Sequence, residues 1–123
     1  MKHRPEYLDL ARIRLPLPGF VSILHRMSGF ILFLALPLTL YLLEASLNSG
    51  SGFDAVTGLL SSFPLKMLEV LLLWALLHHL CAGLRILLLD MGIGTSLPAA
   101  RAASKWVLSI SLALTILIGI KLW

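Results

Sequence analysis

Two adjacent histidines, His78 and His79, stand inside a long apolar segment of this 123-residue chain. An ionisable side chain within the hydrocarbon layer of a membrane is costly, so it usually faces a partner, a cavity or a cofactor. The imidazole of His79 can bind haem iron, and Gly83, four residues later, lies on the same helical face. A missing side chain there lets a flat ring lie close to the backbone. This spacing predicts an iron-porphyrin site centred on His79.

The two histidines also have simpler uses, because a His-x-x-x-Gly pattern is short. His79 could hydrogen-bond a serine or a backbone carbonyl of a neighbouring helix. His78 is rotated by about 100° from His79 on a helix, so it cannot bind the same iron from the opposite side, and we expect it to hydrogen-bond another helix. Zinc is a weaker candidate because it takes four close ligands and the chain offers few. Cys81, the single cysteine, is interpreted as a packing thiol.

A second polar group, Ser22, His25 and Arg26, precedes the first apolar run. If this segment is helical, Ser22 and Arg26 share a face and present a hydroxyl beside a permanent cation. Such a pair could hydrogen-bond a quinone carbonyl or a haem propionate, although the position alone favours a simple anchor at the lipid headgroups. His25 could bind the same iron as His79, but we expect it near the membrane edge, about two helical turns from the depth of His79.

The composition is that of a membrane protein. The chain is 59% hydrophobic and 13% charged, and its mean hydropathy is +0.95, far from the mix of a soluble domain. Its length allows about three spans of roughly 20 residues and no large soluble domain. The net charge of +4 comes from residues that flank the apolar segments, which indicates membrane topology and not nucleic-acid binding.

The positions of charges and prolines predict an all-α integral membrane subunit with three spanning helices. Pro5, Pro16 and Pro18 should keep the N-terminal segment from forming a long helix, and Pro37 should kink the first span. We predict a cytoplasmic lead-in at 1–26, membrane spans at 27–47, 66–89 and 106–123, and loops at 48–65 and 90–105. A signal peptide is disfavoured because the lead-in is long and Glu44 precedes the only region suited to cleavage.

Lysine and arginine counts predict the orientation of the chain. Five of these residues precede the first span and only Lys66 lies between the first two spans, while Arg85, Arg101 and Lys105 lie between the second and third apolar cores. Because cytoplasmic flanks carry the excess of positive charge, we expect the N-terminus in the cytoplasm and the C-terminus on the opposite side. The side chain of Arg85 is expected to extend toward the cytoplasmic face.

Several motifs together resemble one known family. Arg4-Pro5 is followed by Leu8-Asp9-Leu10, then by Ser22-Ile23-Leu24-His25-Arg26-Met27-Ser28-Gly29, and later by His79-x-x-x-Gly83-x-Arg85 with Asp90. This combination covers almost the whole chain and resembles the cytochrome b membrane-anchor subunits of succinate dehydrogenase. The resemblance implies a place in the bacterial inner membrane with a periplasmic C-terminus. It also implies a larger helix bundle with a second small anchor subunit, and assembly with iron–sulfur and flavoprotein subunits.

The resemblance implies roles for individual residues. His79 would be one axial ligand of haem b, with the other ligand supplied by the second anchor subunit, and His25 would lie beside this haem. Ser22 and Arg26 would line the ubiquinone pocket, with Arg26 also near a haem propionate, and Asp90 would help to deliver protons. Electrons from succinate would reach the quinone through the soluble subunits, so the chain would supply a pocket and an anchor but would not be an enzyme alone.

One position departs from the family pattern, and two other functions stay open. The family often has histidine directly after the arginine of the second span, where this chain has Ile86, so an aliphatic side chain replaces a polar haem-side contact. The first alternative is a haem-free membrane scaffold or transport subunit, in which the histidines make helix contacts or move protons. The second is the anchor of a related fumarate reductase, which runs the reaction in the reverse direction.

Overall fold

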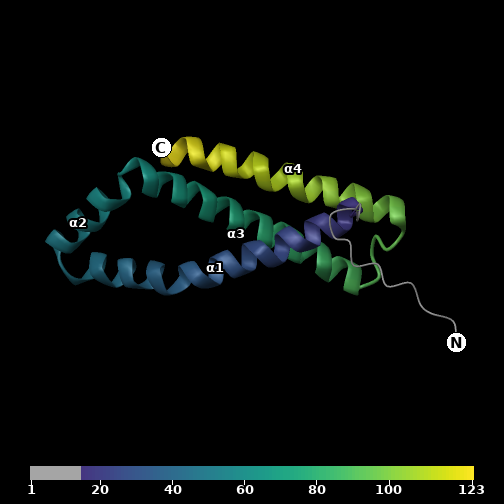
Figure 1. The fold of residues 1–123 in the computed structure, drawn as a ribbon, viewed down its shortest axis with the longest axis horizontal. Helices are drawn as coiled ribbons and strands as arrows, with labels where there is room; N and C mark the ends of the chain where they lie inside the picture. Colours follow the sequence, from purple (N-terminus) through teal and green to yellow (C-terminus); the bar gives the residue numbers. More distant parts are fainter. Residues whose placement is uncertain (1–14) are drawn as a thin grey trace, which may run out of the picture.

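The computed structural model describes residues 15–123 and contains four helices within that range. They are α1 (Leu17–Asn48), α2 (Gly50–Leu60), α3 (Phe63–Asp90) and α4 (Leu97–Leu122). Figure 1 shows α1, α3 and α4 as three long helices, with the short α2 joining α1 to α3 at one end. The Arg4-Pro5 and Leu8-Asp9-Leu10 motifs and the basic residues before Leu15 lie outside the described residues.

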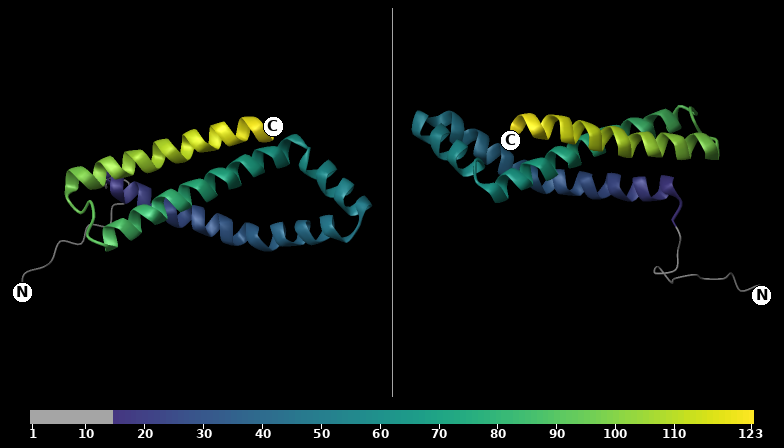
Figure 2. Two further views of the ribbon diagram at one scale, coloured as in Figure 1. Left: turned by 180° about the vertical axis from the view of Figure 1, so that it is seen from behind. Right: turned by 90° about the horizontal axis from the view of Figure 1, so that it is seen from above.

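The expected all-α membrane architecture is confirmed for the described part of the chain. α1, α3 and α4 contain 32, 28 and 26 residues, and each is long and apolar enough to cross a membrane. α3 packs against both α1 and α4. The helices α1 and α3 are close together where His25 meets His79, and they separate toward α2, as Figures 1 and 2 show.

α1 begins at Leu17, ten residues before the start of the predicted first span. Pro18 lies in the first turn, where its missing N–H has no helical partner to lose and its fixed backbone angle suits a helix. The prediction that the prolines keep residues 17–26 out of a long helix is therefore wrong. As a result Ser22, His25 and Arg26 are helical, which is the condition on which their shared face depended.

The loop predicted at 48–65 contains a helix, α2, so the prediction of irregular structure there is wrong. The hydroxyl of Ser49 accepts a hydrogen bond from the backbone N–H of Gly52 (3.0 Å) and caps the start of α2. Gly52 lies against the carbonyl oxygen of Ala45, where no Cβ would fit. Glycine and serine therefore begin this helix and hold it against the end of α1.

The link between α3 and α4 is shorter than the predicted loop at 90–105. It covers residues 91–96, and Gly92 and Gly94 turn the chain with φ angles of +78° and +75°, a region that favours glycine. α4 begins at Leu97 with Pro98 in its first turn. Residues 97–105 are thus helical for the same reason as residues 17–26.

Small side chains fill the contact between α3 and α4. The buried residues of these two helices include Ala75, Ala82, Ser104, Ser111 and Thr115. Small residues let helix backbones approach closely, as they do at many contacts between membrane helices. Most of the large apolar side chains instead lie exposed on the outer faces of the long helices. Such surfaces suit contact with lipid or with other membrane subunits.

Candidate functional site

His79 lies against α1, and only one of its ring nitrogens makes hydrogen bonds within the described chain. Its Nδ1 is 3.1 Å from the carbonyl oxygen of His25. A carbonyl only accepts, so Nδ1–H donates, and an imidazole in this tautomer has its lone pair on Nε2. Ser28 also donates to the His25 carbonyl (2.9 Å), and its oxygen is 3.4 Å from His79 Nδ1. Metal-binding histidines are commonly oriented in this way, through a backbone carbonyl on the second ring nitrogen.

In α1 and α3, a histidine ring of each helix lies over a glycine of the other helix. The His79 ring lies over Gly29, where an added Cβ would be 2.7 Å from its Cε1. The His25 ring lies over Gly83, where an added Cβ would be 3.5 Å from its Nε2. The two rings stack with centroids 4.2 Å apart and planes at 22°. Both helices therefore carry His-x-x-x-Gly, and sequence reasoning used this spacing in α3 but missed it in α1.

His25 lies at the same level as His79, which corrects the expected difference of about two helical turns. The reason is that α1 starts at Leu17, so His25 belongs to a helix that packs beside α3 and not to a lead-in at the membrane edge. Equal depth does not make His25 the second iron ligand. Two axial imidazoles direct their nitrogens at one iron from opposite sides, whereas these rings lie face to face.

His78 faces α4, and the prediction that it hydrogen-bonds another helix is confirmed. Its ring is fully buried, and its Nδ1 is 3.5 Å from the hydroxyl oxygen of Ser111. It stacks on Trp74, one turn earlier on α3, with ring centroids 5.3 Å apart. The adjacent histidines thus have different side-chain partners: His79 lies within hydrogen-bond distance of α1 and His78 within hydrogen-bond distance of α4.

The predicted quinone-site residues lie at the end of the bundle where α1 begins and α3 ends. Ser22 is half-buried and Arg26 is exposed, one turn further along α1. Asp90 is the exposed last residue of α3. Among residues 15–123, no hydrogen bond or ion pair joins these three side chains. The structure therefore places Ser22 and Arg26 on one helix without bringing Asp90 into direct contact with them.

The sequence that forms these helices matches a known protein family. The sequence model of the succinate dehydrogenase/fumarate reductase transmembrane subunit matches residues 1–118. The chain belongs to this family. The resemblance predicted from the motifs is thereby confirmed. With three helices of spanning length, this family member is a multi-pass membrane protein.

Relatives of the chain carry one shared name, succinate dehydrogenase cytochrome b556 subunit. The Coxiella burnetii protein is 37% identical over 121 residues, which make up 98% of this chain and 97% of the relative. The Paracoccus denitrificans protein is 31% identical over 94% of this chain and 88% of its own length. The Rickettsia felis protein is 30% identical over 95% of this chain and 91% of its own length. The similarity therefore extends across all the described helices of this family member.

Arg85 occupies a position that sequence reasoning missed. Its side chain was expected to extend to the membrane surface, but it is only 8% exposed, and its Nε is buried without a hydrogen-bond partner among residues 15–123. A usable signal was its spacing from His78, since seven residues are about two helical turns and place both side chains on one face. The close contact between α3 and α4 then encloses both.

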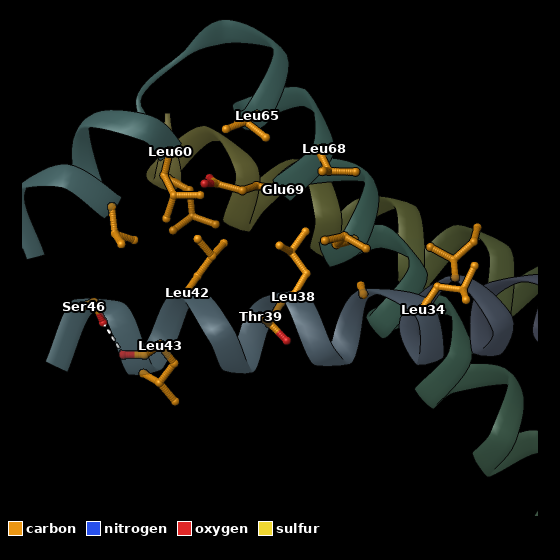
Figure 3. A pocket seen from close by; sticks show the side chains of 15 residues that line it. Leu34, Leu38, Thr39, Leu42, Leu43, Ser46, Leu60, Leu65, Leu68 and Glu69 are labelled. Carbon is orange, nitrogen blue, oxygen red and sulfur yellow. Dashed lines mark hydrogen bonds between the residues drawn. The ribbon is translucent and has the colours of Figure 1, made fainter. Parts of the chain in front are cut away.

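A cavity of about 750 Å³ lies between α1, α2 and α3, away from the histidines. Figure 3 shows Leu38 and Leu42 of α1 and Leu60 of α2 pointing into this space, with the carboxylate of Glu69 approaching from α3. The lining is otherwise almost entirely apolar. None of the predicted site residues lines this cavity, so it is separate from the His25–His79 pair of this family member.

Proposed function

We propose that this family member binds a b-type haem through His79 and helps to form a ubiquinone-reduction site near the start of α1. The relatives' name, cytochrome b556, implies a b-type haem in those proteins. The observation that carries the proposal is the hydrogen bond between His79 Nδ1 and the His25 carbonyl, because it orients the ring and leaves Nε2 available. Haem iron, when bound, supplies a one-electron carrier.

A second small membrane-anchor subunit is proposed to supply the other ligand to the haem iron. His25 stacks on His79 and does not oppose it, which supports a ligand from outside the chain. Exposed apolar side chains along the long helices suit packing against such a subunit. The His25 ring lies over Gly83 beside His79, and we propose that these two residues flank the haem.

Ser22 and Arg26 are proposed to hold the quinone. Reduction of a quinone requires two electrons and two protons, and negative charge builds up on its oxygens. The permanent cation of Arg26 stabilises this charge, and the hydroxyl of Ser22 on the same face donates a hydrogen bond. Asp90, at the same end of the bundle, is proposed to pass protons toward the site from the cytoplasmic side.

Within the complex, the chain is proposed to be non-catalytic by itself. Electrons from succinate would reach it through the flavoprotein and iron–sulfur subunits. The assembly would lie in the bacterial inner membrane with the N-terminus of this chain cytoplasmic and the C-terminus periplasmic. A fumarate reductase would use the same residues in the reverse direction, and the family description includes both activities. The soluble subunits that copurify with the chain identify which of the two complexes it joins.

Arg26→Ala is expected to lower succinate–ubiquinone reductase activity of the assembled complex by about tenfold or more, as for loss of a hydrogen bond to a charged group. Succinate oxidation by an artificial dye should persist, because the dye takes electrons before the quinone site. The measurement is the ratio of the two rates in the same membranes. Arg101→Ala, which removes an exposed arginine elsewhere on the chain, is the matched control and should leave the ratio unchanged. Equal loss of both activities in Arg26→Ala would show an assembly defect and contradict the quinone role.

A further inference from the structure

Arg85 is a buried cation without a counter-charge in the described chain. It is 8% exposed, and its Nε is buried with no hydrogen-bond partner in the part of the chain that the structure describes. Among residues 15–123, no carboxylate oxygen lies within 4.0 Å of its nitrogens. A guanidinium stays protonated in proteins, and a buried charge is strongly unfavourable unless it is paired. Residues 15–123 therefore do not supply the compensating anion.

Arg85 is the one charged residue among the lining residues of a cavity that is almost entirely apolar. This cavity of about 450 Å³ lies between α3, α4 and the link that joins them, and it is partly open. Its lining includes Leu84, Val107 and Ile110. Gly94 also lines it with a φ of +75°, so a larger residue there would be strained. One cation in an apolar cavity suits a ligand with an anionic head and an apolar tail.

The cavity lies where the headgroups of a bilayer are expected. Trp106 lines it and is 65% exposed, and tryptophan is enriched at the membrane–water boundary. The exposed cations Arg101 and Lys105 lie one turn apart on the adjoining start of α4. Basic cavities between membrane helices at this level bind the phosphate groups of anionic lipids.

We propose that the α3–α4 cavity binds an anionic phospholipid, with its phosphate against Arg85 and an acyl chain along the apolar lining. The site is independent of the proposed haem ligand. Arg85 shares the face of His78, which meets α4, whereas His79 meets α1. Loss of haem or of quinone activity would therefore leave this proposal standing, and failure of lipid binding would leave the haem proposal standing.

The test uses the purified complex that contains this chain, stripped of lipid in detergent. Native mass spectrometry would measure the binding of phosphatidylglycerol and of phosphatidylcholine with the same acyl chains. We expect one phosphatidylglycerol site that binds about tenfold more tightly than phosphatidylcholine, and we expect Arg85→Met to remove this preference. Lys121→Met removes a positive charge from an exposed position at the other end of α4 and should keep the preference.

A second variant keeps the charge and tests the cavity itself. Ala103→Phe would place a ring in the cavity while Arg85 stays unchanged, so phosphatidylglycerol binding should fall by about tenfold as well. Inorganic phosphate at millimolar concentration should compete only weakly, because it lacks the acyl chain. Copurification of the partner subunits and succinate–dye activity report whether each variant assembles.

Several outcomes would overturn the lipid site. If Arg85→Met prefers phosphatidylglycerol as strongly as the unchanged chain does, Arg85 does not bind the lipid. Equal loss in Lys121→Met would show unspecific attraction by surface charge. Full competition by inorganic phosphate would identify a free-phosphate site. If Arg85→Met loses a partner subunit, and the delipidated complex of the unchanged chain shows no preference for phosphatidylglycerol, then an acidic group of that partner pairs with Arg85.

Discussion

Replacing His79 with alanine is expected to abolish the b-type haem signal of membranes that contain this chain and its partners. Alanine has no lone pair to offer iron, and the other imidazole of α3, His78, is fully buried against α4. The measurement is the dithionite-reduced minus oxidised absorption spectrum, normalised to the amount of assembled complex. A full signal in His79→Ala would place the ligand elsewhere and contradict the proposed site.

His78→Gln is the matched control, because it changes the adjacent histidine and leaves an amide that can still reach Ser111. The haem signal should persist in this variant. A second control distinguishes a ligand from a residue that only packs. Imidazole added to His79→Gly membranes should replace the missing ligand and restore part of the haem signal. If restoration failed while His78→Gln lost the signal as well, a defect in helix packing would explain the loss.

His25→Ala tests whether haem binding depends on the His25 ring or only on its backbone carbonyl. The carbonyl that holds His79 Nδ1 remains in this variant, so we expect most of the haem signal to remain, with a shifted band position as the stacked ring is lost. A loss as complete as in His79→Ala would instead support the alternative in which one chain supplies both iron ligands.

The spanning helices could be predicted from the sequence because long apolar runs leave few other structures in a membrane. Their starts could not, because proline breaks a helix in its middle but is compatible with its first turn, and the sequence alone did not show which case applied to Pro18 and Pro98. α2 was missed for a similar reason. Its glycines and serines are typical of loops, yet Ser49 caps a helix and Gly52 fits against Ala45.

His79 was found because a polar ring in an apolar run is rare, and that signal needs no knowledge of the fold. Its surroundings depend on how far α1 slides along α3, which is decided by tertiary packing. Only that register reveals that Gly29 receives the His79 ring and that His25 lies at equal depth. Arg85 was misjudged for the same reason, because the close approach of α4 buries it.

Gly29→Val is expected to remove most of the haem from the assembled complex, although position 29 makes no hydrogen bond through a side chain. Any Cβ at this position would be 2.7 Å from His79 Cε1 and 3.1 Å from Nδ1. The ring must then leave the His25 carbonyl or the two helices must separate, and either change turns Nε2 away from its present direction. The haem content per assembled complex is the measurement, and Gly29→Ala should show a smaller loss in the same direction.

Two glycine controls decide between this explanation and a general effect of glycine replacement. Alanine favours helices by about 1 kcal/mol over glycine, so loss of haem in Gly29→Ala could not come from a weaker α1. Gly58→Ala, on α2, has no atom within 4 Å of the new Cβ and should keep the haem. Gly83→Ala meets His25 only at 3.5 Å, which is ordinary contact. Haem loss in Gly83→Ala would thus indicate that the porphyrin lies against Gly83. Full haem content in Gly29→Val would contradict the prediction, because it would show that haem binding does not depend on the observed position of the His79 ring over Gly29.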